Sequence, residues 1–278
     1  MNGSETLGAS ETRVADFESA STRRDAVPPP HKTFLTRVCR LSVIMPFYNE
    51  AANAAKTAAA VVEHAALNPR RQFILADDGS TDETARILAE IVDTADVAGV
   101  EVVHFPVNQG KGRTIKSALD RCTGDAVCFI DGDLAYSLDY LNNIEDSLSE
   151  HEIVIGSRTA AGDRSDRGAR RLYGSTFNWI VRKSLGLPYR DTQAGLKGFR
   201  REVADRLFGL QRLEGFGFDV ELLFLARKFG YAVAEIPARV RPDHTYKASF
   251  RRLFVDSGEA LYEVMRIRHN DRRGLYSL

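Results

Sequence analysis

Residues 41–50 read LSVIMPFYNE, and residues 72–82 read QFILADDGSTD. Each stretch begins with a short apolar run typical of a buried strand, then changes to polar residues followed by a helical pattern. The same change follows VEVVHF (100–105), AVCFI (126–130) and EIVIG (152–156). Strands that alternate with helices predict an α/β fold with a mostly parallel sheet and helices on both faces.

The intervening segments carry the expected helices. They are predicted at about 50–66, 82–92, just after Gly112, and at 138–149, 172–185, 201–209, 218–229 and 250–268. One more short strand is expected in AVAEIP (232–237), whereas DTQAGLKGF (191–199) receives no strand or helix.

The chain divides into three parts. Residues 1–38 are rich in small, polar and acidic residues and contain three consecutive prolines, which predicts a disordered tail. Residues 39–240 form the main domain, and residues 241–278 form an amphipathic helix with a short tail. That helix carries both apolar residues and arginines, so it either packs on the domain or lies on an anionic membrane surface.

Composition narrows the class of protein. Of the 278 residues, 44% are hydrophobic and 27% are charged, which is typical of a folded globular protein. The three cysteines (Cys39, Cys122 and Cys128) are odd in number and lack CxxC spacing, so neither a disulfide framework nor a zinc site is expected. No apolar run approaches the roughly 20 residues of a membrane span, and no signal peptide is evident. A cytoplasmic location follows, with peripheral attachment to the cytoplasmic face of a membrane as a second expectation.

The charge is balanced overall but not along the chain. Lys plus Arg and Asp plus Glu number 38 each, which excludes a nucleic-acid partner bound through bulk charge. Residues 1–157 nevertheless hold 14 basic and 24 acidic side chains, and residues 158–278 hold 24 basic and 14 acidic ones. We expect the acidic half to carry a cation site and the basic half to bind phosphates.

Asp131 and Asp133 follow the apolar run 126–130 with one glycine, Gly132, between them, and this glycine is expected to let a ligand approach closely. Ligands of open α/β sheets bind at the carboxyl ends of the strands, and i, i+2 spacing places two side chains on one face of an extended segment. Two such carboxylates repel each other unless a cation lies near, and Mg²⁺ or Mn²⁺ completed by diphosphate oxygens suits them. The alternative is an ordinary surface turn.

Two further strand ends carry polar residues. Asp78 can accept a hydrogen bond from the ring N–H of a base, which exceeds what capping of the next helix requires. Lys111 lies in NQGKG (108–112), which opens a helix, so this lysine and the backbone amides can meet a phosphate. The segment is neither a P-loop nor a dinucleotide fingerprint.

The ordered set PFYNE, DDGSTD, NQGKG, DGD, GSR (156–158) and DTQAG (191–195) resembles the family 2 glycosyltransferases with the Rossmann-like GT-A fold. The similarity is closest to the polyprenyl-phosphate (dolichyl-phosphate) glucosyl- and mannosyltransferase branch and spans about residues 41–240. The resemblance implies a nucleotide pocket lined by Pro46, Tyr48, Glu50 and Asp78. It also implies that Asp131 and Asp133 hold the metal and the donor diphosphate, and that Arg158 contacts a phosphate of the donor or acceptor.

The expected reaction is inverting transfer of a hexose from a UDP- or GDP-linked donor to an acceptor, with a polyprenyl phosphate favoured. An acceptor phosphate is already ionised, whereas a hydroxyl acceptor on a glycan or small molecule requires a base. Asp191 is then the leading candidate, with Glu221 or Asp219 behind it. A non-catalytic nucleotide-sugar-binding protein is a third alternative.

The remaining candidates lie in the basic half. Arg170 and Arg171 belong to a loop rich in arginine, glycine and aspartate that can close over anionic ligands, and His244 is a candidate donor-site residue. The C-terminal region beyond the sheet is expected to be helical and to serve the acceptor.

Overall fold

The computed structural model describes residues 40–162, 178–242 and 250–277. Its strands are β1 (Leu41–Phe47), β2 (Arg71–Asp77), β3 (Val100–His104), β4 (Ala126–Ile130), β5 (Ile153–Ser157), β6 (Leu196–Arg200) and β7 (Val233–Pro237). Its helices are α1 (Ala51–Leu67), α2 (Thr84–Ala95), α3 (Lys111–Ala118), the short η1 (Leu119–Arg121), α4 (Tyr140–Glu150), α6 (Arg201–Leu210), α7 (Phe218–Lys228) and α8 (Phe250–Arg272), and residues 178–185 are also helical.

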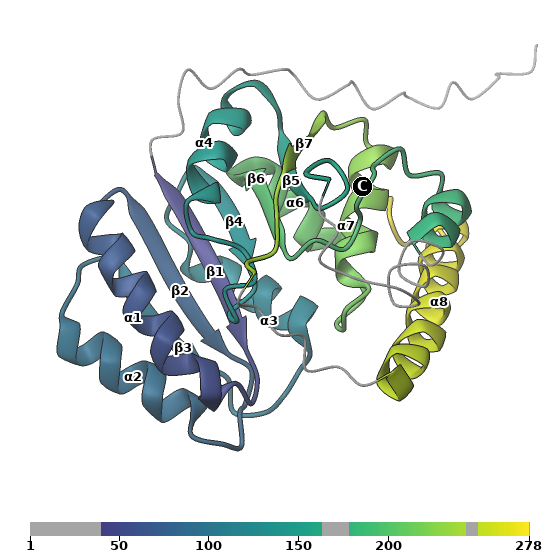
Figure 1. The fold of residues 1–278 in the computed structure, drawn as a ribbon. Coiled ribbons are helices and arrows are strands. Elements are labelled where there is room, and N and C mark those ends of the chain that lie inside the picture. Colours follow the sequence, from purple (N-terminus) through teal and green to yellow (C-terminus); the bar gives the residue numbers. More distant parts are fainter. Residues whose placement is uncertain (1–39, 163–177, 243–249, 278) are drawn as a thin grey trace, which may run out of the picture.

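The seven strands form one sheet in the order β3-β2-β1-β4-β6-β5-β7 (Figure 1). Four of the six pairings are parallel, and both pairings of β6 are antiparallel. The predicted α/β fold with a mostly parallel sheet is therefore confirmed. The apolar runs explain it, because β1, β2 and β4 lie in the interior of the sheet and are buried on both faces.

The helices cover both faces of the sheet, as expected (Figure 1). One hydrophobic core joins α1, α2 and α4 to one face, with Val61, Leu88 and Ile144 as buried members. A second core joins α3, α6, α7 and α8 to the other face. Val264 and Ile267 of α8 are buried in this second core, so part of the last helix packs on the domain.

Strand β6 was missed by the sequence analysis. LKGFR has no apolar run, since Lys197, Gly198 and Arg200 interrupt it, yet all five residues are buried. Each buried cation has partners: Lys197 binds Asp219 and a backbone carbonyl, and Arg200 donates to backbone carbonyls of α4. These bonds compensate for the loss of water and allow charged residues in an interior strand.

Candidate functional site

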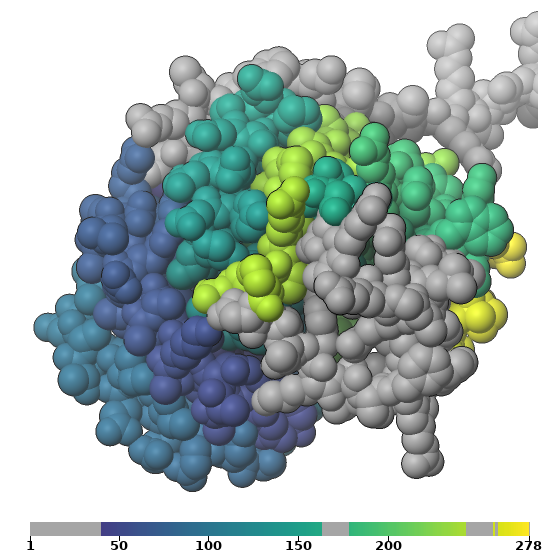
Figure 2. Space-filling model, in the orientation of Figure 1, coloured from purple at the N-terminus to yellow at the C-terminus, as the bar shows by residue number. Residues whose placement is uncertain are grey.

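The carboxyl ends of β2, β1 and β4 lie side by side, because these three strands are adjacent and parallel. Strand β6 runs the opposite way, with Leu196 paired to Ile130, so the residues before β6 arrive at the same edge. The segment after β7 reaches this edge too, where Arg241 N–H donates to Ala135 carbonyl at 2.9 Å. In Figure 2 this yellow-green segment lies across the teal surface. The topology therefore gathers residues from five parts of the chain at this edge.

Asp131 follows β4 directly and is held by hydrogen bonds to the segment before β6 and to the first residue of α3. Its backbone N–H donates to Gly195 carbonyl at 3.1 Å, and its Oδ1 accepts from Lys111 Nζ at 2.6 Å. A Cβ on Gly195 would lie only 1.9 Å from Asp131 Oδ2, so the carboxylate occupies space that only glycine leaves. The Asp131 side chain remains 31% exposed and can therefore reach a ligand.

Gly132 and Asp133 complete the motif. Asp133 Oδ1 accepts from Ala135 N–H at 2.9 Å, in a turn where Leu134 has a φ of 51°. A Cβ on Gly132 would lie 2.7 Å from Pro46 carbonyl, so the glycine is required by packing against β1. The close approach of a ligand at Gly132, expected from the sequence, stays a prediction.

The pair Asp131 and Asp133 fits a divalent cation by its donor chemistry, since carboxylate oxygens are the ligands that Mg²⁺ prefers in proteins. No group of three or more His, Cys, Asp or Glu capable of holding a metal exists within the described ranges. The remaining ligands would therefore be oxygen atoms of a bound ligand and of water, as is usual for Mg²⁺.

Lys111, the first residue of α3, forms an ion pair with Asp131 of the motif. Its Nζ lies 5.9 Å and 5.8 Å from the ring centroids of Phe216 and Phe218, and the side chain is 16% exposed. Burial alone lowers the pKa of Lys111, but the carboxylates of Asp131 and Asp219 outweigh it and hold the pKa above its ordinary value. Lys111 is therefore charged at neutral pH and serves as the counter-ion of Asp131.

Asp78, the candidate for base recognition, is almost completely buried. Its carboxylate accepts from Gln109 N–H at 2.8 Å, Gly110 N–H at 3.0 Å and Asn108 Nδ2 at 3.0 Å. Asp78 thus fixes the loop that precedes α3 and, through it, the start of the helix at Lys111. Its role in base recognition stays a prediction.

The end of β1 forms the rim of the site. Tyr48 is 46% exposed, and Asn49 next to it joins the β2–α2 loop by accepting from Thr81 N–H at 2.8 Å. Glu50 N–H donates to Thr84 Oγ1 at 2.8 Å, which links the segment after β1 to the start of α2. The predicted nucleotide-pocket residues Pro46, Tyr48 and Glu50 therefore belong to one braced segment beside Asp78.

Arg158 and Asp191, predicted as separate catalytic residues, form one ion pair. Arg158 Nε and a terminal guanidinium nitrogen donate to the two carboxylate oxygens at 2.8 and 3.0 Å, and Arg158 N–H donates at 3.1 Å. Burial alone raises the pKa of Asp191, but the hydrogen bonds and charge of Arg158 hold it below its ordinary value. The carboxylate is therefore ionised, already engaged, and a weak base.

A second, fully buried pair lies behind the site and was missed from the sequence. Lys197 Nζ donates to Asp219 at 3.0 Å and to Ala194 carbonyl at 2.6 Å, and it lies 5.6 Å from the centroid of the Phe129 ring. Asp219 also contributes to the charge felt by Lys111. A lysine in an apparently irregular segment gave no signal of this role.

Glu221, the other reserve base, is fully buried and has a supporting role. Its carboxylate accepts from Arg212 N–H at 3.0 Å, Leu213 N–H at 2.9 Å and the Tyr276 hydroxyl. Burial raises the pKa of Glu221 above its ordinary value. Three further candidates, Arg170, Arg171 and His244, lie outside the described residues.

Comparisons with known proteins agree with this arrangement. Residues 42–208 match the family model described as glycosyl transferase family 2. A dolichyl-phosphate β-glucosyltransferase of Dictyostelium discoideum is 30% identical over 70% of this chain and 64% of its own length. The human dolichyl-phosphate β-glucosyltransferase is 28% identical over 71% of this chain and 66% of its own length. The alignments thus span slightly less than two thirds of these relatives.

Among solved structures, glucosyl-3-phosphoglycerate synthase of Mycobacterium tuberculosis superimposes with a TM-score of 0.60. The match covers 82% of this chain and 79% of the synthase at 22% identity, so it supports the fold. That synthase was crystallised with Mn²⁺, UDP and glucosyl-3-phosphoglycerate.

Proposed function

Because this chain belongs to glycosyl transferase family 2 and has the GT-A fold, we propose that it transfers a hexose from a UDP- or GDP-linked sugar to a polyprenyl phosphate, with inversion. The observation that carries the proposal is the partly exposed pair Asp131 and Asp133 at the carboxyl end of β4, beside the ammonium of Lys111. The names of the relatives support the acceptor, since they act on dolichyl phosphate.

Asp131 and Asp133 would hold Mg²⁺ or Mn²⁺, which supplies Lewis-acid stabilisation of the negative charge on the leaving diphosphate. Metal-bound solved neighbours support divalent metal use. Lys111 would then exchange its bond to Asp131 for an oxygen of the diphosphate, because an ammonium next to an anion is stabilised by a charge-assisted hydrogen bond.

The ionised, hydrogen-bonded carboxylate of Asp191 favours a phosphate acceptor over a hydroxyl acceptor. A hydroxyl acceptor needs a base whose pKa lies near the working pH. Asp191 has a lowered pKa, and Arg158 binds both of its carboxylate oxygens. We therefore propose that Asp191 positions Arg158 and does not take a proton from the acceptor. An ionised phosphate acceptor requires no base, and the Arg158 guanidinium can bind phosphate oxygens.

A lipid acceptor requires contact with a membrane surface. No helix in the described ranges is long and apolar enough to cross a bilayer. Helix α8 exposes Leu261, Tyr262 and Met265, and its arginines Arg266, Arg268 and Arg272 belong to the same stretch. Apolar side chains beside cations favour binding to an anionic surface, so we propose peripheral attachment at the cytoplasmic face through α8.

The acceptor assignment is tested by offering the full chain two acceptors with UDP-glucose or GDP-mannose and Mn²⁺. One acceptor is a short-chain polyprenyl phosphate and the other is the matching polyprenol, which lacks the phosphate. We expect sugar transfer to the phosphate alone. Transfer to the polyprenol at a comparable rate would favour the hydroxyl-acceptor alternative, and binding of donor without any transfer or hydrolysis would favour the non-catalytic one.

A further inference from the structure

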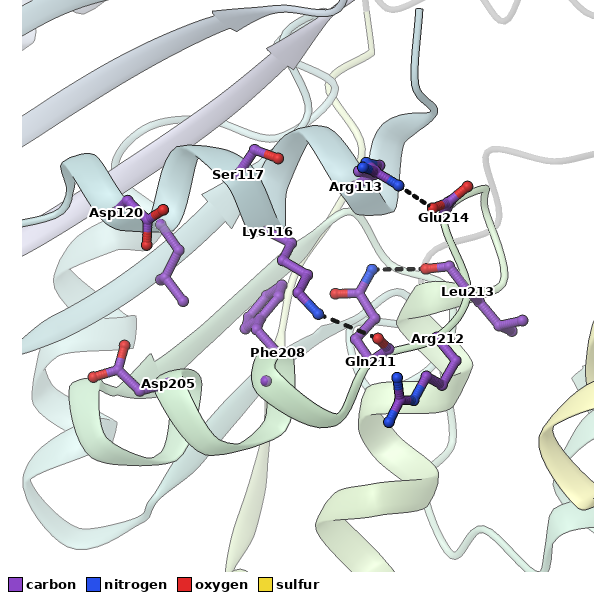
Figure 3. Close-up of a pocket in the computed structure, with 12 residues that line it drawn as sticks. Arg113, Lys116, Ser117, Asp120, Asp205, Phe208, Gln211, Arg212, Leu213 and Glu214 are labelled. Atoms are coloured by element: carbon purple, nitrogen blue, oxygen red, sulfur yellow. Dashed lines mark hydrogen bonds and ion pairs between the residues drawn. The ribbon is translucent and has the colours of Figure 1, made fainter. Parts of the chain in front are cut away.

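A pocket of about 710 Å³ opens between α3 and α6 (Figure 3). Its walls come from α3 with the following η1, from α6, and from residues 211–214. None of the residues predicted to bind the donor lines it, so it is separate from the site around Asp131. Its volume falls in the range of small-molecule sites.

One end of this pocket is positively charged. Lys116 Nζ donates to Gln211 carbonyl at 3.2 Å, and within the described ranges no carboxylate forms an ion pair with Lys116 or Arg212. Burial and the nearby charges of Arg212 and Arg113 lower the pKa of Lys116 and outweigh the opposing carboxylates of Glu221 and Glu214. A bound anion would relieve this repulsion, because each cation would gain a charge-assisted hydrogen bond.

The opposite end offers acceptors for hydroxyl groups. Figure 3 shows Asp120 and Asp205 facing each other from the two helices, at the end of the pocket away from Arg212. Asp205 is already bound by Arg201, at 2.8 Å, which leaves Asp120 as the more available carboxylate. The ring of Phe208 lies between the two ends and gives the pocket an apolar wall.

We propose that this pocket binds the phosphate monoester of a small polyol, such as a sugar phosphate or glycerol phosphate. The phosphate lies between Lys116 and Arg212, and the hydroxyl groups donate to Asp120. A guanidinium and an ammonium together match a phosphate dianion, and a carboxylate oxygen readily accepts from a hydroxyl.

The pocket is connected to the proposed donor site through contacts between residues 211–214 and the start of α3. Arg113 N–H donates to Glu214 carbonyl at 3.1 Å, and a Cβ on Gly110 would lie 2.7 Å from that same oxygen. A ligand held by Lys116 and Arg212 therefore fastens residues 211–214 to α3, the helix that begins at Lys111. The site is a second anion site on the same helix as the first.

Calorimetric titration of the full chain with glycerol 3-phosphate and with inorganic phosphate tests the proposal. Lys116→Met should weaken binding of both probes about ten-fold, the loss expected for one charge-assisted hydrogen bond. Lys228→Met removes a surface lysine paired with Asp271 and is the matched control, which should leave both affinities unchanged. Asp120→Ala should weaken glycerol 3-phosphate alone.

Three results would overturn the proposal. Equal affinity of wild type and a folded Lys116→Met variant for both probes would show that Lys116 does not bind the phosphate. Loss of binding in Lys111→Met but not in Lys116→Met would show that the probes enter the donor site. Equal affinity of wild type for glycerol 3-phosphate and inorganic phosphate would show that the pocket does not recognise the polyol hydroxyl groups. Since the donor site shares none of these pocket residues, each result leaves the proposed transfer untouched.

Discussion

The ion pair between Lys111 and Asp131 determines how the proposed site would bind a metal ion and a diphosphate. Its ammonium lies 2.6 Å from Asp131 Oδ1, the oxygen that a divalent cation would also approach. We expect a lysine in this position to compete with the proposed metal ion for Asp131 when no donor is bound. When the donor diphosphate is bound, we expect the Lys111 ammonium to pair with a diphosphate oxygen instead. Lys111 would then strengthen nucleotide binding, although it weakens metal binding in the absence of nucleotide.

Lys111→Met should therefore raise the affinity for Mn²⁺ in the absence of nucleotide about ten-fold, which corresponds to ~1.4 kcal/mol. The same substitution should lower the affinity for UDP or GDP in the presence of Mn²⁺ by a similar factor, because the diphosphate loses its ammonium partner. Mn²⁺ binding followed by electron paramagnetic resonance and nucleotide binding followed by calorimetry measure the two effects. Weaker Mn²⁺ binding without nucleotide would contradict competition.

Asp191 makes a second prediction at this scale, through pH. Its pKa is lowered in the folded chain relative to about 3.9 for a free aspartate, so its ionised form favours folding. This contribution is complete above the unfolded pKa and is lost as the pH falls through the lower folded pKa.

Asp191→Asn should accordingly lower the free energy of unfolding by about 2 kcal/mol at pH 7, since Arg158 loses a charged partner. The difference from wild type should shrink at pH 3, as the carboxylate becomes protonated. Urea unfolding of both proteins at the two pH values provides the measurement. A difference that grows on acidification would show that the folded pKa is raised.

At the scale of elements, the site depends on the reversed direction of β6. Because β6 runs antiparallel to β4, Gly195 just before β6 lies against Asp131 just after β4. Gly195 leaves the space that the Asp131 carboxylate fills, which makes this glycine a sensitive point of the site.

Gly195→Ala should displace the Asp131 carboxylate and weaken Mn²⁺-dependent nucleotide binding at least ten-fold, because the new Cβ would lie 1.9 Å from Asp131 Oδ2. Gly209→Ala in α6 is the control, since its Cβ meets nothing within 4 Å. In a helix this exchange is expected to stabilise the fold by about 0.5–1 kcal/mol. Unchanged nucleotide binding by a folded Gly195→Ala variant would show that the close contact is not needed.

The elements also show what the sequence can and cannot reveal. Runs such as AVCFI predicted β4, because a continuous apolar run is typical of a strand that is buried on both faces. LKGFR concealed β6, because its buried lysine and arginine are compensated by partners distant in sequence, such as Asp219. The motif residues of the site were therefore predictable, whereas the pairs Lys111–Asp131, Arg158–Asp191 and Lys197–Asp219 required the topology.

At the scale of the whole molecule, the uneven charge has a different meaning from the one the sequence suggested. Counting predicted an acidic half for the cation and a basic half for phosphates. In the structure, Lys111 of the acidic half neutralises Asp131, while Arg158 and Lys197 of the basic half are engaged by Asp191 and Asp219. Paired charges of both signs thus lie at this end of the sheet and directly behind it.

The exposed face of α8 yields the prediction for the whole chain. We expect it to sediment with vesicles containing anionic lipid, less so with neutral vesicles, and less as salt rises, because surface charge is screened. Met265→Glu should reduce binding several-fold without unfolding the chain, since this side chain is 56% exposed. Leu67→Glu, at an exposed apolar position of α1, is the control. Equal loss in both variants would exclude a specific role for α8.

The most direct measurement is the initial rate of labelled hexose transfer from a nucleotide sugar to a polyprenyl phosphate by wild type, Asp133→Asn and Asp146→Asn. Asp146 is an exposed carboxylate of α4 and controls for the loss of one charge. We predict transfer by wild type and Asp146→Asn that stops when EDTA is added, and a rate at least a hundred-fold lower for Asp133→Asn, equivalent to about 2.7 kcal/mol in the transition state. Transfer that survives both EDTA and Asp133→Asn would contradict a donor site built on Asp131 and Asp133.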